Sequence, residues 1–157
     1  MTLKDSLRIA KPSDRDTLVR MMAEFYAESV TPFARHQSAQ AFTEILTDEG
    51  VGLVWIFERG GSAAGYAVLT FGFSMEYGGR DAFLDDLFVR EKHRGYGLGR
   101  AAMELVLDVC AKRGVRAVHL EVGRDNVAAK ELYRRFGFVD HDLQMMTFRL
   151  TPHGAED

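Results

Sequence analysis

A glycine-rich turn between an apolar segment and an amphipathic segment constrains this chain more than any other feature. Residues 94–99 read Arg-Gly-Tyr-Gly-Leu-Gly; the apolar run 83–89 before them predicts a strand, and residues 98–113 after them predict a helix. Glycine permits backbone conformations closed to other residues and lets a ligand approach closely. The first amides of a helix have no partner within it, and the helix dipole favours an anion there. With Arg94 and Arg100 beside it, the turn predicts a site for a phosphate-bearing ligand.

Two common phosphate-binding motifs do not fit this turn. A dinucleotide fingerprint needs G-x-G-x-x-G, but Arg100 stands where the third glycine belongs. The sequence contains no G-x-x-x-x-G-K-[ST] string. The pattern that fits is Arg-x-x-Gly-x-Gly, at Arg94, Gly97 and Gly99. For the glycines alone, a turn that merely ends a strand is the alternative interpretation.

Length and composition predict one domain. The chain has 157 residues, 46% of them hydrophobic and 27% charged, and we expect residues 1–150 to form the domain and 151–157 a disordered tail. No apolar run approaches the ~20 residues of a membrane span, and residues 1–11 are too polar for a signal peptide. The single Cys110 is expected to be buried and inert. These features favour a cytoplasmic protein with no membrane partner.

Charge is distributed unevenly along the chain, whose net charge is −3. Residues 1–86 carry 8 Lys and Arg against 13 Asp and Glu, whereas residues 87–136 carry 11 against 6. We therefore expect an anionic ligand in the second half. The acidic first half could face a cationic substrate, although acidic residues are usually only solvated surface. The overall charge argues against nucleic acid as a partner, since such proteins normally show a dominant basic face.

The hydrophobic pattern predicts a mixed sheet with helices on both faces. We expect strands at 52–58, 63–73 and 81–90 to be antiparallel neighbours, and a helical crossover to make 81–90 and 117–122 parallel. The predicted order is β-α-α-β-β-β-α-β-α-β-β, an α/β (α+β mixed sheet) class. The other predicted elements are a strand at 6–11, helices at 13–29, 38–47, 97–113 and 127–136, and closing strands at 138–142 and 145–150.

This order, with two sequence blocks, resembles the GNAT family of N-acetyltransferases. "LDDLFVREKHRGYGLGRAAMELVLDVC" is similar to the strand-four, loop and helix-three block of that family, and "GRDNVAAKELYRRFGFV" is similar to its strand-five exit and helix four. The resemblance covers nearly the whole chain. It implies a single-domain GNAT fold whose central sheet is splayed between strands four and five, with acetyl-coenzyme A as co-substrate.

The resemblance also implies a cofactor site. The backbone of strand four would bind the pantetheine arm, the turn amides would hold the pyrophosphate, and the start of the last helix would approach the far end of coenzyme A. Lys130 could reach a phosphate or could be a solvated helix lysine. The implied residues are Leu87, Phe88, Val89, Arg94, Gly95, Tyr96, Gly97, Leu98, Gly99, Arg100, Asn126, Lys130 and Tyr133.

Catalytic candidates come from chemistry and resemblance together. Tyr133 matches the usual general acid of the family; a core aromatic is the alternative. Two adjacent carboxylates in an apolar strand are costly unless paired, hydrated or functional. Strict alternation would send Asp85 and Asp86 to opposite faces unless a bulge intervenes. "LDDLFV" is similar to the "LEDLFV"-type stretch of polyamine- and diamine-type acetyltransferases, which implies Asp85 as base, directly or through water, and Asp86 as ammonium anchor. One surface acid and one structural acid are the alternative.

Weaker candidates for acceptor binding are Tyr26, Glu28 and Glu76, together with His36; for each, plain surface is the favoured interpretation. We expect His93 to be exposed. The histidines show no zinc spacing and there is one cysteine, so we predict no metal.

The sequence thus predicts an acetyl-coenzyme A-dependent N-acetyltransferase that acts on a primary amine by direct attack in a ternary complex. A small cationic amine is the favoured acceptor. A protein lysine or N-terminus is the alternative acceptor, and a non-catalytic acyl-coenzyme A-binding module is the alternative class. The resemblance further implies a homodimer.

Overall fold

The computed structural model describes residues 7–151 and shows a five-stranded sheet in the order β1-β2-β3-β4-β5. The first four strands are antiparallel neighbours, and β4 pairs with β5 in parallel. This confirms the predicted mixed sheet. The strands are β1 (Leu7–Ile9), β2 (Gly52–Arg59), β3 (Ser62–Ser74), β4 (Gly79–Val89) and β5 (Ala117–His119); the α-helices are α1 (Arg15–Glu28), α2 (Arg35–Ile45), α3 (Leu98–Lys112) and α4 (Val127–Arg135).

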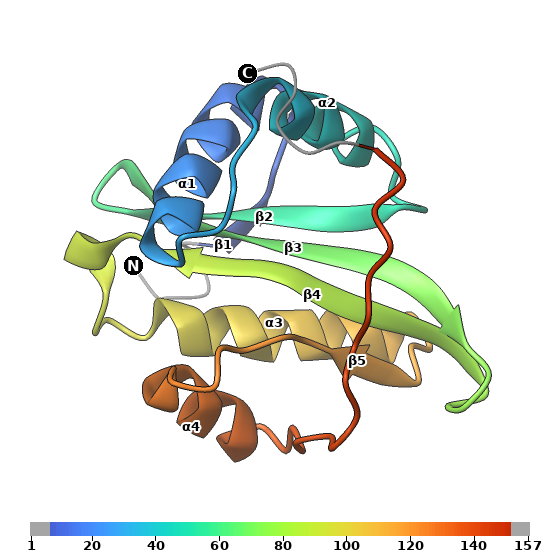
Figure 1. Cartoon of the computed structure of the whole chain (residues 1–157). Coiled ribbons are helices and arrows are strands. Elements are labelled where there is room, and N and C mark those ends of the chain that lie inside the picture. Colours follow the sequence, from blue (N-terminus) through green and yellow to red (C-terminus); the bar gives the residue numbers. More distant parts are fainter. Residues whose placement is uncertain (1–6, 152–157) are drawn as a thin grey trace.

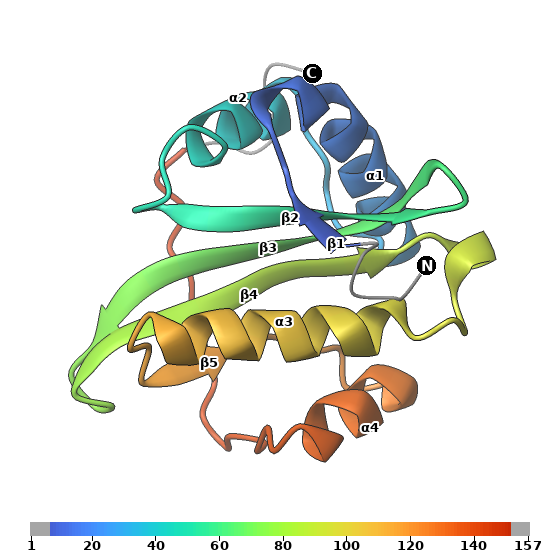
Figure 2. The ribbon, with the colours of Figure 1, turned by 180° about the vertical axis from the view of Figure 1, so that it is seen from behind.

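Helices cover both faces of the sheet (Figure 1; Figure 2 from behind). Strand β2 is apolar along most of its length because it serves two cores. Its Trp55 and Phe57 belong to the cluster that contains α3, whereas Ile56 belongs to the cluster that contains α1 and α2. Two short 3₁₀ turns, Pro12–Asp14 before α1 and Glu91–His93 after β4, complete the described elements. No helix in residues 7–151 has the length and apolar character that crossing a membrane requires.

Strands β2 and β3, predicted as antiparallel neighbours, form a hairpin. Gly60 and Gly61 form its turn with φ angles of 59° and 77°. Positive φ at both central residues matches the twist of the flanking strands, and glycine adopts it without steric cost.

The splay between β4 and β5 is also present. Their pairing is limited to three residue pairs, from Asp81 with Ala117 to Phe83 with His119. Strand β4 continues to Val89, while β5 ends at His119, three residues before its predicted end. The second half of β4 therefore has no strand on the β5 side.

The two predicted closing strands, 138–142 and 145–150, are wrong for the described structure. Residues 139–150 carry no strand and pair with none of the five strands. The alternating apolar residues give this segment strand propensity, but a strand also needs a neighbour to bond with. Here the segment leaves α4 and runs past the sheet toward α2 instead of returning to β5 (Figure 1). Of the predicted tail, residues 152–157 lie outside the described residues.

Gly65→Ala is expected to lower the free energy of unfolding by about 2 kcal/mol or more, because the added Cβ would overpack the buried contact between the paired strands β3 and β4. That Cβ would collide with the Phe88 carbonyl oxygen and lie 2.8 Å from Phe57 Cδ2. Gly123→Ala is the matched control, since its Cβ would meet nothing within 4 Å. Urea unfolding measures both; equal stability of the two variants would contradict the packing described for β3 and β4.

Candidate active site

A β-bulge brings the two adjacent aspartates to one face of the sheet. In the β3–β4 ladder Val68 pairs with Asp86 and Leu69 pairs with Leu84, so Asp85 is an extra residue without a partner. Leu84 and Leu87 both belong to the core on the α3 side. The extra residue thus reverses the alternation. Asp85 and Asp86 consequently line the same pocket on the opposite face.

Asp86 is a buried carboxylate held by two phenols. Its side chain is 7% exposed; Tyr66 donates to Oδ2 at 2.7 Å and Tyr26 donates to Oδ1 at 3.3 Å. Burial raises the pKa of the Asp86 carboxyl, and the two hydrogen bonds oppose part of that rise. Burial is the main cause that raises the pKa of both phenols, and the negative charge of Asp86 raises it further. Tyr26 and Tyr66 therefore remain hydrogen-bond donors at neutral pH.

Asp85 lies beside Asp86 in a different environment. Its carboxyl opens to solvent through the pocket, but the pocket walls remove part of its hydration. This desolvation, together with the negative charges of Asp86 and Glu121, raises the pKa of Asp85 to about 6. A carboxylate with a pKa in this range can accept a proton near neutral pH.

The pocket between α1, α2 and the sheet is acidic and partly aromatic. Its volume is about 470 Å³, and its lining includes four carboxylates but no lysine or arginine. The lining residues are Met22, Tyr26, Ser38, Ala41, Phe42, Glu44, Ile45, Val51, Val68, Thr70, Phe83, Asp85, Asp86 and Glu121. Glu44 and Glu121 were not predicted, because a glutamate in the last turn of a helix or just after a strand looks like ordinary surface in the sequence.

The glycine-rich turn has the geometry of an anion site. Gly95 and Gly97 adopt φ angles of 83° and 82°, and Gly97 is the N-cap of α3. The Ala101 amide bonds the Gly97 carbonyl at 3.0 Å, so the amides of residues 98–100 precede the first bond of the helix. Such amides and the positive end of the helix dipole suit a phosphate. An added Cβ at Gly95 would meet nothing within 4 Å, so the turn is open on that side.

The two arginines of the turn have different partners. Arg94 Nη2 contacts both carboxylate oxygens of Glu28 at 2.7 and 2.8 Å, and its Nε donates to the Val89 carbonyl at 2.8 Å. The Arg94 side chain thereby ties the end of α1 to the turn. Arg100 is exposed and pairs with Glu104 at 3.4 Å.

The other predicted cofactor residues lie on the second half of β4 and on α4. Leu87, Phe88 and Val89 bond β3 on one side and lie beyond the last β4–β5 pair on the other. Asn126 is the N-cap of α4, and its side chain accepts a hydrogen bond from the Ala129 amide at 3.2 Å. Lys130 and Tyr133 lie on that helix, both half-buried.

Tyr133 packs against the core with its ring 5.9 Å from that of Phe138. Burial raises the pKa of its phenol, so the hydroxyl stays protonated at neutral pH.

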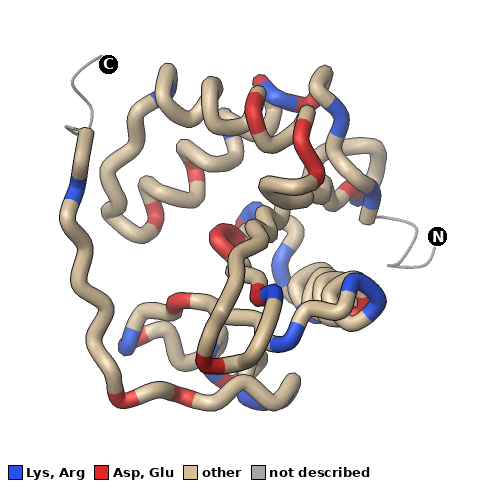
Figure 3. Tube along the Cα trace, turned by 90° about the vertical axis from the view of Figure 1, so that its right-hand side faces the viewer, with Lys and Arg blue, Asp and Glu red and all other residues tan. Residues whose placement is uncertain are grey.

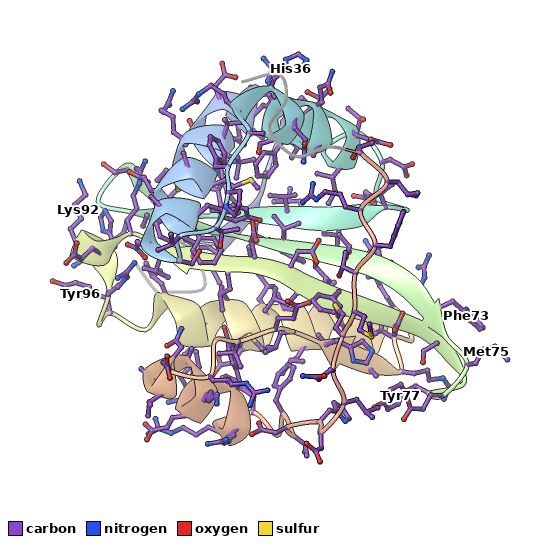
Figure 4. All side chains as sticks on the ribbon, in the orientation of Figure 1. His36, Phe73, Met75, Tyr77, Lys92 and Tyr96 are labelled. Atoms are coloured by element: carbon purple, nitrogen blue, oxygen red, sulfur yellow. The ribbon has the colours of Figure 1, made fainter. Side chains whose placement is uncertain are left out.

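The weaker acceptor candidates are scattered. Tyr26 lines the pocket, whereas Glu28 is bound to Arg94. Glu76 lies between Met75 and Tyr77 at the tip of the β3–β4 hairpin, at the end of the sheet opposite Lys92 and Tyr96 (Figure 4). His36 is on α2 and outside the lining of the acidic pocket.

Cys110 is buried as predicted, but the expectation for His93 is wrong. His93 is 7% exposed because the turn after β4 folds it beneath Arg59, whose Nη1 is 3.4 Å from its Nδ1. Its Nε2 has no hydrogen-bond partner among the described residues. Burial and the nearby cations lower the pKa of His93. Within residues 7–151, no group of three or more His, Cys, Asp or Glu side chains is arranged to hold a metal ion.

The chain is similar to several known proteins. A model of the acetyltransferase (GNAT) family matches residues 18–138. The structure is similar to the crystal structure of integron cassette protein HFX_CASS3 from the mobile metagenome of Cole Harbour Salt Marsh. The two chains are 37% identical with a TM-score of 0.86, over 98% of this chain and 95% of that one.

Two curated relatives match shorter segments. The thialysine N-epsilon-acetyltransferase of Bos taurus is 30% identical over 82 residues, which are 52% of this chain and 48% of that protein. The ribosomal protein bS18-alanine N-acetyltransferase of Escherichia coli K12 is 36% identical over 77 residues, 49% of this chain and 51% of that protein. The chain thus spans about half the length of these curated relatives.

The Asp85 carboxyl is expected to titrate near pH 6 in the folded protein. NMR of the carboxyl carbon as a function of pH measures this midpoint. Glu121→Gln removes a neighbouring negative charge and should lower the midpoint, because a like charge disfavours ionisation. Glu91→Gln, outside the pocket, should leave the midpoint unchanged. A wild-type midpoint near the ordinary aspartate value of about 3.9 would contradict the environment described for Asp85.

Proposed function

This chain belongs to the acetyltransferase (GNAT) family, and from that premise we propose that it transfers the acetyl group of acetyl-coenzyme A to the primary amine of a small cationic acceptor. The proposal rests on the fact that the glycine-rich turn and the acidic pocket both adjoin the second half of β4. A turn suited to phosphate leads to the open half of β4, and that half of β4 carries Asp85 and Asp86 at the wall of an acidic pocket.

The residues present fit coenzyme A. Its pyrophosphate would rest on the amides of residues 95–100, where positive-φ glycines leave the backbone uncovered. Its pantetheine arm would bond the free edge of Leu87, Phe88 and Val89, which β5 does not occupy. Asn126 and Lys130 would approach its far end from α4.

The acceptor amine enters mostly as an ammonium ion, since such groups have a pKa near 10.4. The four carboxylates of the pocket, with no lining cation, would attract it. Asp86, fixed by Tyr66 and Tyr26, would anchor the ammonium. Asp85, whose pKa of about 6 suits a base near neutral pH, would take the proton directly or through water. The freed amine would then attack the thioester directly in a ternary complex.

Tyr133 would act as the general acid. The departing thiolate of coenzyme A is stabilised by a proton, and the Tyr133 phenol remains protonated because burial raises its pKa. The backbone amides of β4 would support the oxyanion that develops on the thioester carbonyl.

Two alternative functions are less well supported by the structure. Acetylation of a protein lysine or N-terminus would need a groove open to a polypeptide, whereas the acidic pocket holds about 470 Å³, which suits a small molecule. A non-catalytic acyl-coenzyme A-binding module would have no use for Asp85 or Tyr133. A cytoplasmic location and a homodimer stay predictions.

Release of free thiol from acetyl-coenzyme A should be fastest with an acceptor that carries two cations, because the pocket holds more negative charge than one ammonium neutralises. We expect putrescine to exceed butylamine and lysine peptides in kcat/KM. Glu44→Gln should lower kcat/KM for putrescine about tenfold and change that for butylamine little. Glu91→Gln is the control, since Glu91 is outside the acidic pocket. Faster turnover of lysine peptides would favour the protein acceptor, and coenzyme A binding without turnover would favour the binding module.

Tyr133→Phe should lower kcat about a hundredfold, the size of a general-acid contribution, while leaving the affinity for coenzyme A unchanged. The phenyl ring keeps its packing against Phe138, so folding should be unaffected. Tyr77→Phe, at the hairpin tip, is the control. Full activity of Tyr133→Phe across the pH range would show that Tyr133 is not the acid.

A further inference from the structure

The Arg59 side chain joins the end of β2 to the glycine-rich turn. Its guanidinium carbon lies 3.3 Å from the centroid of the Tyr96 ring, which is the stacking distance of a cation–π contact. Its Nη1 is 3.4 Å from Nδ1 of His93. Arg59 therefore contacts both the residue that precedes the turn and the aromatic residue within it.

The middle of the turn is held by little else. Backbone hydrogen bonds fix the chain before the turn, where the His93 amide is bonded at 2.8 Å, and after it, where α3 begins. Between these points the amides of residues 95–97 donate to no backbone carbonyl in the part of the chain that the structure describes. The Tyr96 ring is 52% exposed, so burial alone does not hold it. The stack on Arg59 is therefore the side-chain contact that can fix the middle of the turn.

Arg59 also differs from the other arginines near the turn in its partners. Lys and Arg residues are spread over many parts of the chain (Figure 3), so position alone does not identify a phosphate contact. Arg90, Arg94 and Arg100 are each paired with a glutamate, at 2.8, 2.7 and 3.4 Å. Arg59 forms no ion pair with a carboxylate among residues 7–151. Its positive charge is thus not neutralised within the described chain, and such a charge attracts an anion.

The buried His93 ring supports Arg59 from inside the fold. Burial and the nearby cations lower the pKa of His93, so the ring is neutral at pH 7. A neutral ring that accepts from Arg59 at Nδ1 carries its proton on Nε2. That Nε2 has no hydrogen-bond partner among the described residues, and a buried donor without a partner lowers stability. Stability alone therefore does not favour this arrangement, and a function at this place would account for it.

We propose that Arg59 is a positioning residue of the phosphate site. Its guanidinium holds Tyr96 so that the turn amides stay directed at the phosphate, and its charge adds to the attraction for that phosphate. This inference rests on the proposed function, because it takes the turn as the site of the coenzyme A pyrophosphate. A turn fixed in its binding conformation binds more tightly, since only a fraction of the molecules with a free turn would be competent to bind.

Calorimetric titration with coenzyme A, together with NMR of the same proteins without ligand, tests the proposal. Arg59→Ala and Tyr96→Ala should each raise the Kd for coenzyme A about tenfold, the effect expected of a partly desolvated cation–π contact. The double variant should bind no more weakly than Arg59→Ala, because both changes remove the same contact. In the free wild type, the side-chain protons of Arg59 should show an upfield ring-current shift that Tyr96→Ala abolishes.

Conservative variants separate this role from a general effect on folding. Tyr96→Phe keeps the ring and should bind coenzyme A like the wild type, and Arg59→Lys keeps the cation and should recover most of the affinity. Arg80→Ala is the matched control. Arg80 lies over the Phe71 ring at 5.0 Å and pairs with Phe73, at the end of the sheet opposite Tyr96 (Figure 4), so its loss should leave the Kd unchanged.

The outcomes distinguish this inference from the proposed function. A wild type that does not bind coenzyme A would overturn the proposed function and this inference with it. Binding by the wild type that Arg59→Ala leaves unchanged would overturn the inference alone. Losses of affinity that add in the double variant, or an Arg59 without the ring-current shift, would also overturn the inference alone.

Discussion

One extra residue in the central strand determines what this fold can do. Strand β4 must place apolar side chains on both faces of the sheet, so regular alternation would bury one of its adjacent aspartates in the α3 core. The bulge at Asp85 shifts the alternation, and Leu84 and Leu87 then both face that core while Asp85 and Asp86 both face the pocket. The aspartates thereby differ in role: Asp86 is fixed by two phenols, and Asp85 stays accessible.

The divergence of β4 from β5 is the second feature on which the candidate site depends. After three residue pairs the strands separate, so Leu87, Phe88 and Val89, which follow the aspartates, have no strand on that side. A ligand with a phosphate at one end and a reactive thioester at the other can therefore lie along β4. Arg94 ties this turn to Glu28 of α1, so the helix that carries Tyr26 into the pocket is coupled to the phosphate site.

Local patterns predicted well those features that local physics determines. Residue type and neighbours predicted the two strands on either side of Gly60 and Gly61, and the helices that follow Gly97 and Asn126. Long-range placement was harder to predict. Glu44 of α2 and Glu121, two residues after β5, line one pocket although they are far apart in the sequence. His93 is buried beside Arg59, which ends strand β2. The strands expected at 138–142 and 145–150 had the right alternation, but whether they pair depends on a neighbour that the single chain does not provide.

A crystal structure with coenzyme A and putrescine tests the central claim most directly, because the claim is about where two ligands meet. The account predicts the pyrophosphate on the amides of residues 95–100, the pantetheine arm along the free edge of β4 and the amine beside Asp85 and Asp86, with the thiol facing it. A thiol directed away from the acidic pocket, or an amine bound elsewhere, would contradict the account.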